Sequence, residues 1–220
     1  MEFGLPFSFP FKDPDWFKKI GIIALVSLIP VVGQMVAFGW GLEVARRVIN
    51  HDPDPLPSLD FGDQLKKGFQ AWVISFVYAL PMIVLMLPLQ LALPIGQMLE
   101  IDEETLSIIM IAVSICCGGL SLIYGIFMAF MLSAAYGRFV TEGTIGSGLK
   151  FGEVLKLVKA APVAYLIVLL GQIVAGFVGS LGSIACGIGV LLTMAYSFAI
   201  IGHFIGQAYN QATLALSHQP

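Results

Sequence analysis

Five long apolar stretches dominate the pattern of hydrophobic and polar positions along the chain. They cover residues 20–45, 69–93, 106–136, 161–181 and 188–208. A helix needs about 20 apolar residues to cross a bilayer core of about 30 Å, whereas a barrel strand needs only about 9–11. The stretches suit helices and show no period-two alternation. The pattern therefore predicts an all-α integral membrane protein with four to five transmembrane helices.

The composition indicates a lipid environment. The chain of 220 residues is 58% hydrophobic and 11% charged, whereas about 25% of the residues in a soluble domain are charged. The net charge of −3 is small, so we expect no nucleic-acid partner. The first apolar stretch is longer than the roughly 7–15 residues of a signal-peptide core, and we expect it to be retained.

The eleven basic residues mark the loops that we expect on the cytoplasmic side. Four flank the first loop and four flank the third: Arg46, Arg47, Lys66 and Lys67, then Arg138, Lys150, Lys156 and Lys159. The second loop, from Glu100 to Glu104, is acidic and holds no base. Because Lys and Arg accumulate in cytoplasmic loops, we expect the first loop, the third loop and the C-terminus in the cytoplasm.

Pro30 lies inside the first apolar stretch and leaves the side of the N-terminus open. Five full spans would place Lys12, Lys18 and Lys19 outside. A proline inside a helix removes a hydrogen bond and kinks or breaks the helix. If the leading helix, residues 16–50, is broken near Pro30 and its first part, Trp16–Ile29, is re-entrant or interfacial, all eleven basic residues become cytoplasmic. Such irregular backbone must be buried in protein or line water.

A short phrase occurs twice, as SLDFGDQLKKG from Ser58 and as GLKFGEVLKLV from Gly148. Each copy precedes an apolar stretch, which indicates a parallel repeat of helix pairs at 58–141 and 148–212. Residues 1–15 and 213–220 are then the tails of a single membrane domain. Both phrases predict amphipathic elbow helices in the headgroup plane, which either bind anionic lipid or only anchor the next span. Possible headgroup contacts are Arg46, Arg47, Lys66, Lys67, Arg138, Lys156 and Lys159.

Small residues recur every four positions on two of the apolar stretches. They are Gly33, Ala37, Gly41 and Ala45 in the first stretch, and Gly125, Ala129, Ser133 and Gly137 in the third. Small side chains let helix backbones approach closely, which is a main source of helix association in lipid. We therefore predict that these eight residues form helix-packing faces.

Few polar residues lie within the apolar stretches. Gln34, Gln90 and Gln172, with the break at Pro30, either line a small polar cavity or form hydrogen bonds between helices. Glu43 precedes Arg46 and Arg47 by three and four residues, so we expect it to pair with them. His203 is expected to lie at the interface or to be hydrogen-bonded.

The sequence offers no recognisable chemistry. No nucleophile with its base, no phosphate-binding loop and no pair of catalytic carboxylates can be assembled, so we expect neither catalysis nor a cofactor. The histidines and the three cysteines have no metal-binding spacing. Cys117 and Cys186 begin two spans in similar places, and they either form a disulfide or serve as small packing residues.

Several segments together resemble one family. They read DPDWFKKIGIIALVSLIPVVGQ, then GLEVARRVINHD and LPSLDFGDQLKKGFQAWV, and finally HFIGQAYNQA. They are similar to the uncharacterised bacterial and archaeal multi-pass family called domain of unknown function 4013. The resemblance implies a helical protein in the cytoplasmic membrane of a prokaryote, and it implies no reaction, substrate or catalytic residue.

Three functions fit these observations. The first is a non-catalytic scaffold or accessory subunit, which packs through its small-residue faces against a membrane protein partner or a second copy. The second is a small-molecule transporter or channel with a polar cavity near Pro30 and Gln172. The third is a lipid-binding or lipid-handling protein that uses its basic residues. Membrane lipids are expected partners in each case.

Overall fold

The computed structural model describes residues 1–54, 56–185 and 188–218, and these residues form helices and no strand. Four helices are long and apolar enough to cross a membrane, which confirms the predicted fold class. These four are α4 (Phe61–Met98), α5 (Glu103–Glu142), α8 (Pro162–Leu181) and α9 (Ile188–Ser217). The shorter helices are α1 (Leu5–Ser8), η1 (Phe9–Lys12), α2 (Trp16–Val26), α3 (Val32–Ile49), α6 (Ile145–Gly148), α7 (Phe151–Ala160) and η2 (Gly182–Ala185).

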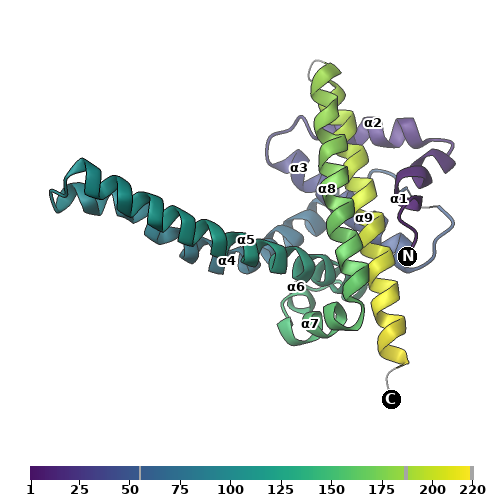
Figure 1. The fold of residues 1–220 in the computed structure, drawn as a ribbon. Coiled ribbons are helices and arrows are strands. Elements are labelled where there is room, and N and C mark those ends of the chain that lie inside the picture. The colour runs from purple at the N-terminus through teal and green to yellow at the C-terminus, as the bar shows by residue number, and fades with distance from the viewer. Residues whose placement is uncertain (55, 186–187, 219–220) are drawn as a thin grey trace. The chain divides into compact units, whose positions relative to one another are not determined.

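The chain divides into two compact units, which we describe separately. The body consists of Met1–Ile74 and Phe130–Pro220, and the hairpin consists of Ser75–Ala129. In the body, α8 and α9 run antiparallel side by side (Figure 1). Helix α9 also packs along α3, so it forms the centre of the body.

Helices α3 and α9 run parallel and touch through their backbones. A Cβ atom added to Gly202 would lie 2.0 Å from the carbonyl oxygen of Gly41, and one added to Gly206 would lie 2.8 Å from that of Ala45. The spacing between these contacts is four residues on both helices. Small residues therefore bring the two backbones together.

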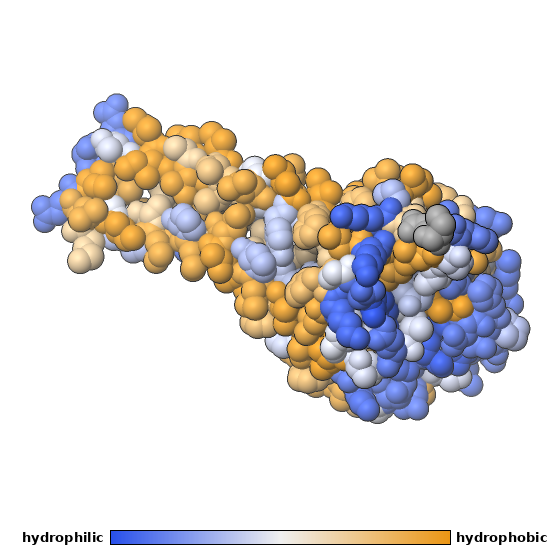
Figure 2. Space-filling model, turned by 90° about the horizontal axis from the view of Figure 1, so that it is seen from below, coloured by the Kyte–Doolittle hydropathy of each residue, from blue (hydrophilic) through white to orange (hydrophobic). Residues whose placement is uncertain are grey.

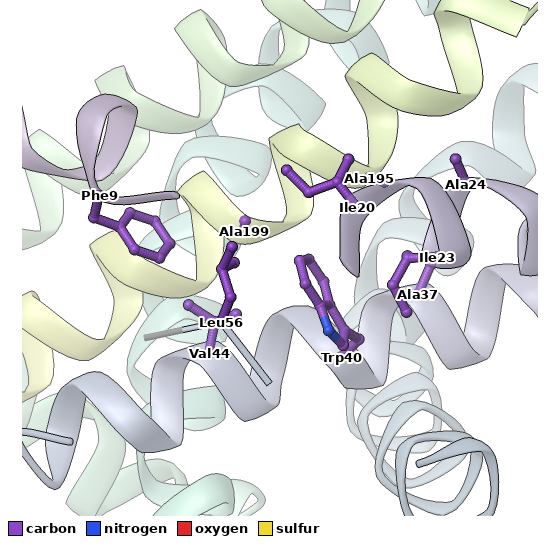
Figure 3. Close-up of a cluster of buried hydrophobic side chains, with 10 residues drawn as sticks. All are labelled: Phe9, Ile20, Ile23, Ala24, Ala37, Trp40, Val44, Leu56, Ala195 and Ala199. Carbon is purple, nitrogen blue, oxygen red and sulfur yellow. The ribbon is translucent and has the colours of Figure 1, made fainter. Parts of the chain in front are cut away.

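The core of the body surrounds Trp40, whose side chain is fully buried. Figure 3 shows Trp40 pointing from α3 toward Ile20 of α2 and Ala195 of α9. Its indole Nε1 donates a hydrogen bond to the carbonyl oxygen of Pro57 at 2.9 Å. A buried indole N–H needs a partner, and this bond ties the first loop to the middle of α3.

The first apolar stretch is divided into α2 and α3 at the place where the sequence predicts a break, around Pro30. Val31 has φ 64° and ψ −61°, and the N–H of Val32 donates to the carbonyl oxygen of Pro30 at 2.7 Å. These values define a γ-turn with positive φ, which is strained for a β-branched residue. A Cβ added to Gly33, near the start of α3, would meet the backbone of Val26 at the end of α2, whereas Trp40, further along α3, points toward Ile20, nearer the start of α2. The two helices therefore form an antiparallel pair.

The two predicted elbow helices differ, which corrects the expectation that they are alike. The first phrase continues without interruption into the span, so elbow and span form the single helix α4. The second forms the separate helix α7, which ends where Ala161 has φ −140° and ψ 61°. The residue before a proline disfavours the α region, and Pro162 follows Ala161. The first phrase has no proline at the equivalent place.

The hairpin is formed by the second half of α4 and most of α5. Tyr124 donates a hydrogen bond to the carbonyl oxygen of Tyr78 at 2.6 Å, and Leu106 packs against Gly96 near the turn. Asp102 Oδ1 accepts a hydrogen bond from the N–H of Thr105 at 2.9 Å and caps α5. Most large apolar side chains of the hairpin are exposed, and Figure 2 shows a predominantly hydrophobic surface with a hydrophilic tip.

Candidate functional site

A buried carboxylate joins α3 to α4 in the body. Glu43 is 6% exposed and accepts hydrogen bonds from Arg46 at 2.6 Å and from Lys67 at 2.6 Å. Arg47 lies 3.7 Å from the same carboxylate. Burial raises the pKa of Glu43, but the hydrogen bonds from Arg46 and Lys67 outweigh this effect and hold the pKa below its ordinary value. The predicted pairing of Glu43 with Arg46 and Arg47 is confirmed, and Lys67 joins it from α4.

Five of the seven predicted headgroup contacts are engaged in ion pairs. Arg46, Arg47 and Lys67 surround Glu43, Arg138 pairs with Glu142 and Glu153, and Lys156 pairs with Glu153. Lys66 and Lys159 are exposed and have no ion pair among the described residues. The seven bases therefore do not form one free cationic surface.

The amphipathic faces of the two phrases also turn partly inward. Val154 and Leu157 of α7 are buried in the body, as Gln64 is in α4. Phe61 and Phe151 remain exposed at matching positions of the two copies. Each phrase thus packs one face against the body and leaves one aromatic residue at the surface.

Most of the predicted packing residues are buried within the chain itself. Gly33, Ala37, Gly41 and Ala45 are buried in α3, and Ser133 and Gly137 are buried in α5. Gly125 and Ala129 lie in the hairpin and are half-buried. The close neighbours of Gly41 belong to α9, and the ring of Tyr209 lies against Gly137. The buried faces therefore assemble the body and are not free for a partner.

The four residues predicted to surround a polar cavity take separate roles. Gln34 donates to the carbonyl oxygen of Ser27 at 3.2 Å and caps the turn at Pro30. Gln172 donates to the hydroxyl of Ser133 at 3.2 Å, which is the interhelical bond that the sequence left as an alternative. Gln90 is exposed on the hairpin. Gln34 lines a cavity of about 360 Å³, but apolar side chains make up most of its wall.

A larger and more polar cavity lies beside the C-terminal half of α9. Its volume is about 600 Å³, within the range of small-molecule sites. We call it the α9 cavity, and it is lined by Met1, Leu5, Val48, His51, Asp52, His203, Gln207, Asn210, Gln211 and Leu214. Figure 2 shows many hydrophilic residues on the face of the body that it displays.

We did not predict this cavity, although the sequence contains a pattern that indicates it. His203, Gln207, Asn210, Gln211 and Leu214 follow one another at helical spacing, so they share one face of α9. A polar face on an apolar helix indicates contact with water or with a polar ligand. The sequence could not show that the first loop, through His51 and Asp52, completes the wall.

Hydrogen bonds fix the side chains at the centre of the α9 cavity. Gln207 Oε1 accepts a bond from the N–H of Glu2 at 3.0 Å, and its Nε2 lies 3.0 Å from Nδ1 of His203. The amide nitrogen can only donate, and Nδ1 of His203 is therefore an acceptor. The neutral imidazole then carries its proton on Nε2. His203 is hydrogen-bonded, which is one of the expectations from the sequence.

His51 and Asp52 are held by the C-terminal cap of α3. The N–H of His51 donates to the carbonyl oxygen of Val48 at 3.2 Å, and the N–H of Asp52 donates to that of Arg47 at 2.9 Å. This pair of bonds is a Schellman motif, in which the residue with positive φ is usually glycine. Here it is His51, with φ 56°. Asn210 of α9 donates to the carbonyl oxygens of Val48 and Ile49 and completes the cap.

The two alternatives for the cysteines stay open. Cys117 is buried in the hairpin. Cys186 lies outside the described residues. Among the residues that the structure describes, no three His, Cys, Asp or Glu side chains are grouped to hold a metal ion.

Together these features define a multi-pass helical membrane protein with four apolar helices of spanning length. A family model described as "Protein of unknown function (DUF4013)" matches residues 22–188. The match covers well over half of the chain, so the protein belongs to this family, as the sequence motifs predicted. Neither a curated protein nor a solved structure matches the chain.

Proposed function

We propose that this protein is a non-catalytic accessory subunit that binds an apolar transmembrane helix of a partner protein through its hairpin. The observation that carries the proposal is a set of open glycines on α5. A Cβ added to Gly118, Gly119 or Gly125 would have no described atom within 4 Å apart from those of the adjacent residues and of the local helix backbone. In the body, by contrast, glycines such as Gly41 and Gly202 meet backbone atoms of a neighbouring helix.

Open glycines suit a helix better than they suit lipid. Gly118 and Gly125 are seven residues apart, so they lie on the same face of α5. A notch of this kind lets a second helix approach closely, which gains van der Waals contact along the whole crossing. Flexible acyl chains fill the same notch only by losing conformational freedom. The scaffold hypothesis therefore moves from the small-residue faces of the body, which are already occupied, to the hairpin.

The same proposal includes an orientation in the cytoplasmic membrane of a prokaryote. The antiparallel pair of α2 and α3 returns toward the side from which it starts, and α4, α5, α8 and α9 then cross the membrane four times. In this arrangement all eleven basic residues and both termini face the cytoplasm. A cysteine introduced at exposed Ser217 should react with an impermeant thiol reagent only after the cells are opened. Labelling of intact cells would contradict this orientation.

The experiment that tests the accessory role compares two glycine variants in the native membrane. Gly125→Leu fills the notch of the hairpin, whereas Gly176→Leu fills an equally open glycine of α8 and serves as the matched control. After gentle extraction, native mass spectrometry should show a stoichiometric complex with one other protein in the wild type and in Gly176→Leu. The complex should be lost in Gly125→Leu.

Three results would contradict the accessory role of the hairpin. If the wild type is extracted only as a monomer, it has no partner protein, and the accessory role is excluded. A homodimer that Gly125→Leu dissociates would show that the notch binds a second copy, and the role would then be self-assembly. If both variants retain the same complex, the partner binds elsewhere.

A further inference from the structure

We propose that the body binds a neutral amphiphile, a hydrocarbon chain that ends in one uncharged hydrogen-bonding group, in two adjoining cavities beside Phe198 of α9. Both cavities lie in the body, so the proposal does not depend on the accessory role of the hairpin. Three observations carry it: a glutamine amide that is only half used, walls without a charged side chain, and an open apolar groove as long as one leaflet is thick.

The first of these spaces, which we call the head cavity, lies between the start of α3 and the first half of α4. Its volume is about 360 Å³. Met35 and Phe38 of α3, Trp72 of α4 and Phe198 of α9 form most of its wall, and Gln34 provides its amide. Small-molecule sites are typically of this kind, with apolar and aromatic walls and few polar groups that orient the ligand.

The turn at Pro30 fixes the amide of Gln34 and leaves part of it free. The carbonyl oxygen of Ser27 lies at the end of α2, where helix carbonyls lack a partner within the helix. Gln34 Nε2 donates to it at 3.2 Å. An amide group has two N–H donors and an acceptor oxygen, and no other side-chain hydrogen bond of Gln34 occurs among the described residues. One N–H and Oε1 therefore remain for a ligand.

A free amide in this wall favours a ligand that can hydrogen-bond. A polar group in apolar surroundings is costly unless it is paired. A hydroxyl can donate to Oε1 or accept from the remaining N–H, and a carbonyl can accept from that N–H. A hydrocarbon chain alone, such as an acyl chain of a bulk phospholipid, would leave the amide of Gln34 unpaired.

The end group should also be neutral. No charged side chain occurs among the described residues that line the two cavities. Lys67 precedes Gly68 of the wall, but it pairs with Glu43 and Asp63 and does not line the cavity. A phosphate, carboxylate or ammonium group would lose hydration here and meet no opposite charge, which is unfavourable.

The second space, which we call the tail groove, lies between α8 and α9 and has a volume of about 340 Å³. Its wall on α9 extends from Val190 to Ile201, which is about 17 Å at 1.5 Å per residue. One leaflet of the hydrocarbon core is about 15 Å thick. Gly176 leaves the groove open on α8, because a Cβ there would have no described atom within 4 Å beyond the adjacent residues and the local helix backbone.

The tail groove offers no further donor to a polar ligand. Ser180 and Ser197 line it, and both hydroxyls already donate to backbone carbonyl oxygens. Its other lining residues are apolar or glycine. Because Phe198 lines both spaces, they adjoin at this residue. A chain in the groove with its end group at Gln34 uses both walls, whereas water would satisfy the amide but leave the apolar surface wet.

Photoaffinity labelling of the purified full-length protein in detergent tests this site. The probe is hexadecanol with a diazirine in the middle of its chain, and the matched probes carry a carboxylate or a trimethylammonium group instead of the hydroxyl. We expect saturable labelling by the alcohol on peptides that contain the walls of the two cavities, with competition by unlabelled hexadecanol. The two charged probes should label these peptides about tenfold less.

Two variants address the end group and the chain separately. Gln34→Leu removes the amide at similar volume and should weaken labelling by the alcohol about two- to tenfold, the usual effect of one hydrogen bond. Its matched control is Gln172→Leu, because Gln172 is a half-buried glutamine of the body that lines neither cavity. Gly176→Leu fills the groove and should abolish its labelling without lowering the melting temperature. Its control is Gly152→Leu, at an open glycine of α7.

Several results would overturn the proposal. Labelling that does not saturate, or equal labelling by all three probes, would mean that the chains only coat the protein as detergent does. Unchanged labelling of Gln34→Leu would show that the amide does not hold the end group. If Gln34→Leu lowers the melting temperature, Gly176→Leu decides, and labelling equal to that of Gly152→Leu refutes the site.

The neutral end group can belong to an isoprenoid alcohol or quinone, or to a diacylglycerol or fatty alcohol, and lipids that are purified with the protein distinguish these sources. Lipids are extracted from the wild type and from Gly176→Leu after gentle purification from the native membrane and are identified by mass spectrometry. A neutral lipid enriched in the wild type and depleted in Gly176→Leu identifies the source. Enrichment of phospholipids alone, or of no lipid, refutes the proposal.

Discussion

Replacing Gly202 by alanine tests whether the contact between α3 and α9 holds the body together. The added Cβ would lie 2.0 Å from the carbonyl oxygen of Gly41 and 3.2 Å from the Cβ of Val44. A carbon atom needs about 3.3 Å from an oxygen. To reach that distance, the two helices would have to separate by about 1 Å at their crossing.

The size of the effect follows from two opposing contributions. Overpacking of a well-packed core costs about 1–3 kcal/mol, and the upper part of this range applies because the obstacle is backbone rather than a flexible side chain. Alanine stabilises a helix relative to glycine by about 1 kcal/mol. The net loss is about 2 kcal/mol, which for a chain of this length corresponds to a melting temperature lowered by about 4–8 °C.

Two further glycine variants turn this prediction into a graded series. A Cβ added to Gly41 would lie 2.8 Å from the carbonyl oxygen of Phe198, which is a smaller overlap. A Cβ added to Gly176, on α8, would have no described atom within 4 Å. We expect Gly202→Ala to be the least stable, Gly41→Ala to be intermediate and Gly176→Ala to equal or exceed the wild type.

The assay measures the protein that remains monodisperse in size-exclusion chromatography after heating in detergent. All variants are compared in the same detergent, because lipid and detergent affect every melting temperature. The reasoning would be refuted if Gly202→Ala melted as the wild type does, or if Gly176→Ala were destabilised as much as Gly202→Ala. Either result would mean that the backbone contact between α3 and α9 does not limit stability.

Three other predictions concern charge, pH and backbone strain in the body. Glu43→Gln leaves Arg46 without its acid and removes one of the two acids that pair with Lys67. It should cost about 2–3 kcal/mol, measured as a shift of the midpoint of urea denaturation. Because the pKa of Glu43 is lowered by folding, its stabilisation is complete above the unfolded pKa of about 4.3 and is lost as the pH falls through the folded pKa. This prediction would be contradicted if lowering the pH through this range destabilised the wild type no more than it destabilises Glu43→Gln. His51→Gly should raise stability by about 0.5–1 kcal/mol by relieving the positive φ, and an unchanged or lower midpoint would show that His51 is not strained.

The sequence predicted the elements whose signals are local. Four of the apolar stretches became α4, α5, α8 and α9, because a long run of apolar residues leaves a helix as the only way to satisfy its backbone in lipid. The division near Pro30 was predictable because proline has no backbone N–H and a fixed φ angle. The pairing of Glu43 with Arg46 depended on three-residue spacing within one helix.

The sequence was less informative where the outcome depended on tertiary surroundings. The two phrases look alike, yet only the second ends as a separate helix, because Pro162 follows it. Small residues every four positions predicted packing faces, but their spacing could not show that Gly41 meets Gly202 of the same chain rather than a partner. That choice depends on the direction in which α9 runs beside α3.

The class of protein, its apolar helices and its family were determined by the amino-acid sequence alone, because hydrophobic length and local motifs do not depend on how helices are arranged. Tertiary structure decided which polar groups share a site. Gln34, Gln90 and Gln172 have similar chemistry but separate surroundings, whereas Asp52 and Asn210 lie far apart in sequence and line one cavity. A cavity is a property of the space between helices, and only their packing defines that space.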